Sequence, residues 1–225
     1  MEPSAHLQIL KRTGSVLLTI GLIDIAVMVY CIVNRISYSS SFNIFGVIAG
    51  VFLLRGSLRA ATIVRWFTVF SLASSVALIV ALPFLQPVGL TLTEVRLGGP
   101  LYILAQLGFM TGAFALLFWL NHQLSRAPIQ AAQAAMGRKA HDMRIPAAAG
   151  IGLVVIIAIV MSVVGSGDTA AKAKLLAEHQ LCANYEYHLS SFKQFTNDKG
   201  SGVTAVVTAW NEEEVRNVSV KWEDH

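Results

Sequence analysis

The sequence predicts an α-helical polytopic membrane protein with five transmembrane helices and a small C-terminal α+β domain outside the cytoplasm. Apolar residues make up 55% of the chain and charged residues 13%, whereas a soluble domain carries roughly 25% charged residues. Residues 146–165 contain no charge and would form about 30 Å of helix, the thickness of the hydrocarbon core of a bilayer. After residue 166 the pattern changes to one short helix and alternating strands, which is typical of a water-soluble domain.

These observations divide the chain into four parts. We expect a four-helix transmembrane bundle at 1–120, a basic cytoplasmic connector at 121–145, a fifth transmembrane helix at 146–165 and an extracytoplasmic domain at 166–225. Residues 1–145 carry 11 Lys and Arg against 4 acidic residues, and residues 166–225 carry 6 against 9. The basic residues therefore belong to the membrane part, where they set topology, and we expect no nucleic-acid partner.

The expected spans of the bundle differ in how well the sequence defines them. Long apolar runs cover 13–33, 60–85 and 101–120. The remaining run, 42–54, is short for a bilayer, although 36–54 is long enough if its polar residues begin the helix at the interface. A re-entrant segment is the alternative. The loop at 86–100 contains TLTEVRL, which fits either a short strand or a surface helix.

The distribution of Lys and Arg predicts the orientation. The N-terminus and the second–third and fourth–fifth connectors hold nine of these residues, and the other two connectors hold two. The positive-inside rule therefore places the N-terminus in the cytoplasm, and five spans place the tail domain on the opposite side of the plasma membrane, the inner membrane if the protein is bacterial. Connector 121–145 is either a basic helix lying on anionic lipid or a solvated linker.

The tail domain is expected to pack one helix, 170–183, on a three-stranded antiparallel meander. The strands are expected at 185–190, 203–210 and 218–223, with turns at 197–202 and 211–214. About 55 residues provide only a marginal core, so we expect support from the loops, from another subunit or from the membrane surface. This α-β-β-β order resembles, at the level of fold, small extracytoplasmic modules of the PepSY or cystatin-like kind. The resemblance implies a shape and no function.

Asp24 lies near the middle of the first span, where a carboxylate costs about 2.5–3.5 kcal/mol. It shares one helix face with Leu17, Gly21, Met28 and Cys31. Possible partners for the carboxylate are Arg55, Arg59, Asn43 and Gln106. Asp24 is therefore either a proton- or ion-linked residue or a contact that holds helices or subunits together.

Two further features concern packing. The pairs Gly46/Gly50 and Gly108/Gly112 each form a GxxxG pattern, which lets a neighbouring helix approach closely. Cys31 and Cys182 would both lie on the outer side of the membrane. They are either two free thiols or a disulfide, which requires Cα atoms within about 7 Å.

The sequence contains no recognisable catalytic set. It lacks HExxH, GxGxxG and GxSxG patterns, and we expect no catalytic, cofactor-binding or metal-binding residues and no cofactor. Our hypothesis is a non-enzymatic accessory or assembly subunit whose bundle and outer domain bind partner proteins, either other membrane subunits or further copies of the chain. The alternative is a small oligomeric transporter or channel with Asp24 as its proton- or ion-linked residue.

Overall fold

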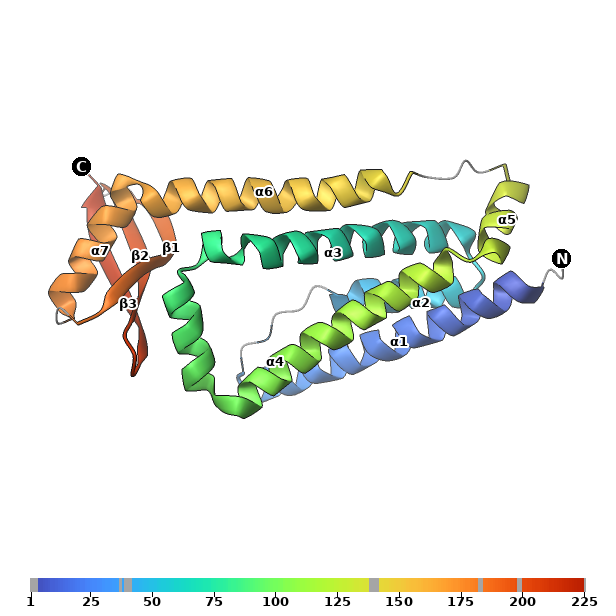
Figure 1. The fold of residues 1–225 in the computed structure, drawn as a ribbon, viewed down its shortest axis with the longest axis horizontal. Helices are drawn as coiled ribbons and strands as arrows, with labels where there is room; N and C mark the ends of the chain where they lie inside the picture. The colour runs from blue at the N-terminus through green and yellow to red at the C-terminus, as the bar shows by residue number, and fades with distance from the viewer. Residues whose placement is uncertain are drawn as a thin grey trace. The chain divides into compact units, whose positions relative to one another are not determined.

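The computed structural model describes residues 4–36, 38, 42–137, 142–181, 184–197 and 200–224 (Figure 1). These residues form seven helices and three strands: α1 Ser4–Val33, α2 Phe42–Leu54, α3 Leu58–Leu85, α4 Val88–Leu124, α5 Ala127–Ala135, α6 Arg144–Ser166, α7 Asp168–Gln180, β1 Glu186–Asn197, β2 Gly200–Trp210 and β3 Val215–Asp224. The chain divides into two compact units, Met1–Ser74 with Gly112–Gly150 and Ser75–Thr111 with Ile151–His225. The first is called the N-terminal unit below, and the second the C-terminal unit.

Four helices, α1, α3, α4 and α6, are long and apolar enough to cross a membrane. By this criterion the chain is a multi-pass membrane protein. The expected second span corresponds to α2, which has 13 residues. That is about 20 Å of helix, shorter than the hydrocarbon core.

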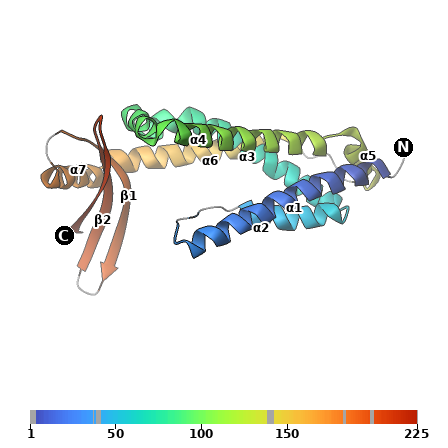
Figure 2. The same cartoon turned by 90° about the horizontal axis from the view of Figure 1, so that it is seen from below.

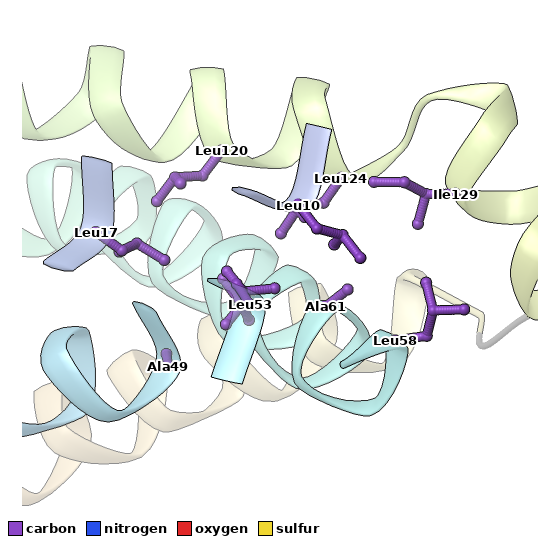
Figure 3. Packing of buried hydrophobic residues seen from close by; sticks show 10 residues of the cluster. Leu10, Leu17, Ala49, Leu53, Leu58, Ala61, Leu120, Leu124 and Ile129 are labelled. Carbon is purple, nitrogen blue, oxygen red and sulfur yellow. The ribbon is translucent and has the colours of Figure 1, made fainter. Parts of the chain in front are cut away.

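The N-terminal unit is organised around a tight pair of helices, α1 and α2. A Cβ atom added to Gly50 would lie 2.9 Å from the Gly14 carbonyl oxygen, so the two backbones touch. Beside this contact, Figure 3 shows leucines of α1, α2 and α4 pointing into one buried cluster. Its members are Leu10, Leu17, Ala49, Leu53, Leu58, Ala61, Val64, Leu120, Leu124 and Ile129.

Helix α5 contributes to this core. Ile129 is fully buried in the cluster, and Gln133 Nε2 donates a hydrogen bond of 3.1 Å to Thr62 Oγ1 of α3. Pro128 stands in the first turn of the helix, and Gly137 follows its end with φ 69°. The apolar side of this part of the connector thus faces protein.

Helix α4 is two helices joined at a kink. Gly99 has φ 71° and ψ 175°, and Pro100 follows it. Glycine adopts this left-handed backbone without steric cost, and proline cannot donate the hydrogen bond that a continuous helix needs. The stretch TLTEVRL therefore lies in a separate helix, 88–98, and not in a strand.

The tail domain is the predicted helix and meander. The strand order is β1-β2-β3 with both pairs antiparallel, and α7 lies against the sheet in both views (Figures 1 and 2). Their shared core consists of Ala170, Ala173, Ala177, Leu189, Ala205, Val207 and Val220. Small alanines on α7 let the helix approach the valines of the sheet closely.

Candidate functional site

The face of α1 that carries Asp24 is the packed face of the helix. Leu17 and Gly21 are buried and Asp24 is half-buried, as are Met28 and Cys31 farther along the same face. This face is the one that the sequence predicted. Asp24 therefore points toward protein.

The hydrogen bond to Asp24 comes from Tyr38, in the connector between α1 and α2. The phenolic hydroxyl of Tyr38 donates to Asp24 Oδ1, and it lies 3.2 Å from the Asp24 backbone oxygen. The hydroxyl of Tyr38 thus lies at the level of Asp24, back along α1 from Val33. Sequence reasoning missed this partner, because no spacing rule links a tyrosine in a polar connector to a residue in the preceding helix.

The structure does not bring the expected arginine partners to Asp24. A Cβ atom on Gly56 would lie 2.9 Å from Leu7 Cδ2, so the corner that holds Arg55 and Arg59 adjoins the beginning of α1. Leu7 precedes Asp24 by roughly 25 Å along the helix axis at 1.5 Å per residue. The side chain of Asn43 lies outside the described residues, and Gln106 belongs to the other unit.

Replacing Tyr38 with phenylalanine is expected to lower the free energy of unfolding by about 0.6–1.7 kcal/mol, the range of hydrogen bonds between membrane helices. The measurement is thermal unfolding of the full chain in detergent. A double-mutant cycle with Asp24→Ala isolates the pair, since the double variant should lose less than the two single losses combined. Strictly additive losses would show that the two side chains do not interact.

The glycine pairs have different surroundings. Gly46 and Gly50 are both buried, and Gly50 makes the backbone contact with Gly14 described above. A Cβ atom on Gly108 or on Gly112 would meet nothing within 4 Å. The first pair packs within the chain, and the second pair leaves an open strip on α4.

Gln106 stands out among the residues of α4. Its side chain is exposed and makes no hydrogen bond with any residue that the structure describes. It lies in the apolar part of α4 that follows the kink. An amide in this position has to find a partner that the described chain does not supply.

The core of the N-terminal unit also holds buried polar atoms that sequence reasoning missed. Four of them have no hydrogen bond with the described residues: Thr13 Oγ1, Arg65 Nε, Ser74 Oγ and Asn121 Oδ1. Each comes from a helix that reads as apolar in sequence. Hydropathy alone carries no signal that would have identified them.

In the tail domain, the pKa values of the Glu214–Arg216 pair and of His188 are shifted from their usual values. Hydrogen bonds from Tyr185 and from Arg216 lower the pKa of Glu214, and the Arg216 Nε–Glu214 Oε2 distance is 2.8 Å. The same contact raises the pKa of Arg216. On β1, desolvation and the nearby Lys174 lower the pKa of His188.

The stability of the tail domain should fall as the pH falls through the titration of His188. The folded domain disfavours the charged imidazole, so the unfolded chain, with a pKa of about 6.5, takes up the proton first. The contribution of the neutral His188 imidazole to the free energy of unfolding is therefore fully present above about pH 6.5 and decreases as the pH falls below it. Hydrogen exchange of β1 and β2 amides in the full chain measures this effect, and His188→Gln should flatten the slope. Lys174→Gln should flatten it in part, and an unchanged slope in His188→Gln would contradict the assignment.

No cluster that could hold a metal ion occurs among the described residues. Cys31 is a free thiol, and Cys182, its possible disulfide partner, lies outside the described residues. Comparison of the chain with protein-family models, with curated proteins and with solved structures finds no match. Function therefore has to be argued from the residues themselves.

Proposed function

We propose that the protein is a non-enzymatic integral membrane subunit, an accessory or assembly protein that binds partner proteins through α4 and through its tail domain. The observation that carries this proposal is Gln106, which is exposed in a long apolar helix and has no hydrogen bond with the described part of the chain. An unsatisfied amide in hydrocarbon costs several kcal/mol. A polar group on the helix of another subunit, or of a second copy of this chain, removes that cost.

The rest of α4 is consistent with such a contact. Only 6% of the residues in its apolar window are buried within the chain. Gly108 lies two residues beyond Gln106, on the opposite side of the helix, and with Gly112 it forms the strip that no atom approaches within 4 Å. At Gln106 and at Gly108, α4 thus has room for a neighbouring helix.

The tail domain offers a second contact surface. Among the described strands, β1 and β3 each pair with β2 alone. Within that part of the chain each therefore has one edge of backbone N–H and C=O groups without a strand beside it. Such an edge is a template for an added strand. The domain therefore suits binding to a partner outside the membrane.

The proposal also includes a topology in which the chain crosses the membrane five times and its N-terminus lies in the cytoplasm. The contacts Gly50–Gly14 and Gly56–Leu7 support it, because they bring the chain back to the end of α1 from which it started. A re-entrant segment would return to the other end of α1. Connector and α2 together then make the second crossing, α3, α4 and α6 make three more, and the loop charges place the tail domain outside the cytoplasm.

Co-purification from native membranes tests the proposed function. A partner recovered with the wild-type chain after crosslinking should be lost with Gln106→Leu and partly retained with Gln106→Asn, which keeps the amide. The melting temperature of the purified chain should not change in either variant, because Gln106 has no hydrogen-bond partner among the residues that the structure describes. Equal recovery with Gln106→Leu, or a wild-type chain that is only ever monomeric and alone, would contradict the proposal.

A further inference from the structure

Residues 88–98 form a helix of their own between two membrane segments. Helix α3 ends at Leu85, the next helix starts at Val88, and Gly99 ends it with a non-helical backbone. Figures 1 and 2 show this first part of α4 crossing the direction of the neighbouring part of α3. All of these residues belong to the C-terminal unit.

The short helix has two apolar sides with different surroundings. On one side Leu90 is 3% exposed. On the other side Val88, Leu92 and Val95 follow the i, i+4, i+7 spacing of a single helix face. They are 56%, 64% and 39% exposed, respectively. This exposed stripe is unexpected for a helix in water.

The connections at its two ends fix the level of the helix. Only Gln86 and Pro87 separate it from α3, and only Gly99 separates it from the long apolar part of α4. Each of these residues can span at most about 3.5 Å. Gln86 Nε2 also donates a hydrogen bond of 3.0 Å to Glu94 Oε2, which ties the corner to the helix. A helix held in this way between two spans stays at the membrane surface.

We propose that residues 88–98 lie in the membrane interface, with Val88, Leu92 and Val95 inserted among the lipids. The occupant of the stripe is thus the glycerol and upper acyl region of the bilayer, as in other amphipathic interfacial helices. The charged residues of the segment are Glu94 and Arg96, and their charges cancel. Insertion therefore depends on apolar area and requires no anionic lipid.

A flank of this helix, beside the stripe, faces the tail domain. A Cβ atom added to Gly89 would lie 3.4 Å from Trp210 Nε1 and 3.7 Å from Glu186 Oε2, so the helix lies close to the side chains of a residue pair that joins β1 to β2. Trp210 itself is buried. The interfacial helix thus holds the sheet close to the membrane surface.

Site-directed fluorescence on the full chain in vesicles tests this inference. A single cysteine is introduced at Val95, on the exposed stripe, or at Thr93 on the other side of the helix, in a background carrying Cys31→Ser and Cys182→Ser. Each is labelled with an environment-sensitive dye. The dye at Val95 should show blue-shifted emission, quenching by lipids brominated near the headgroup end of the chain, and protection from aqueous iodide. The dye at Thr93, which is half-buried on the side that carries Leu90, should not be quenched by the brominated lipids.

The remaining outcomes overturn the inference. Iodide quenching at both positions would place the stripe in water, and protection from both iodide and brominated lipid at Val95 would show that protein covers it. Loss of lipid quenching in vesicles without anionic lipid would contradict apolar insertion. The result does not depend on the partner contact at Gln106, since the purified chain alone is measured.

Discussion

Replacing Gly50 with leucine should separate α1 from α2 and lower the free energy of unfolding by about 3 kcal/mol, the upper end of the usual cost of overpacking. A Cβ atom at this position would lie 2.8 Å from the Leu18 nitrogen and 2.9 Å from the Gly14 oxygen. Both are backbone atoms, so no side-chain rotation relieves the clash. The loss can be measured as a lower melting temperature of the full chain in detergent.

The matched control for this variant is Gly108→Leu, which adds the same side chain to a helix glycine that has nothing within 4 Å. It should leave the melting temperature of the isolated chain within experimental error. Gly14→Leu should behave like Gly50→Leu, because its Cβ would lie 2.8 Å from the Gly50 oxygen. Equal stability of Gly50→Leu and Gly108→Leu would disprove the close α1–α2 contact.

The positions of the long helices could be predicted from the sequence because a membrane leaves little choice. A segment in hydrocarbon has to satisfy its backbone internally and remain apolar for about 20 residues, and both properties are visible in sequence. Helices α1, α3 and α6 and the second part of α4 all lie where such runs occur. The run at 42–54, the expected second span, is too short to carry the same signal.

The tail domain could be predicted because the spacing of its apolar residues changes along the chain, from the spacing of a helix to the alternation of strands. The predicted first strand ended at 190, however, and β1 continues to Asn197. The register shifts between Leu189 and Ser191, so one extra residue interrupts the alternation of the side chains. A bulge of this kind makes a strand appear to end in sequence although the pairing continues beyond it.

The contacts between the helices could not be predicted in the same way. A transmembrane helix is apolar on all sides, so hydropathy does not reveal which face packs against protein. Gly14 has no glycine four residues away to mark it, and yet it is the partner of Gly50. Tyr38 approaches Asp24 only because the connector turns back along α1. The same difficulty applies to α5, whose alanine-rich sequence resembles a surface helix.

Replacing Ile129 of α5 with alanine should therefore cost about 2–5 kcal/mol, the usual loss when a fully buried isoleucine is truncated. Ile129 is 0% exposed and packs in the cluster that contains Leu10 and Leu124. The matched control is Met136→Ala just beyond α5, where the side chain is exposed and the change should stay within about 0.5 kcal/mol.

Comparing the Ile129→Ala variant in detergent and in lipid vesicles shows whether α5 packs against protein or against lipid. If Ile129 fills the protein core, Ile129→Ala will weaken hydrogen-exchange protection of α5 equally in neutral detergent and in vesicles containing anionic lipid. A helix that instead rested on the lipid surface would lose protection only in the vesicles, because no lipid surface is present in detergent. The Gln133–Thr62 hydrogen bond supports the first result, since it joins α5 to α3 whatever surrounds the protein.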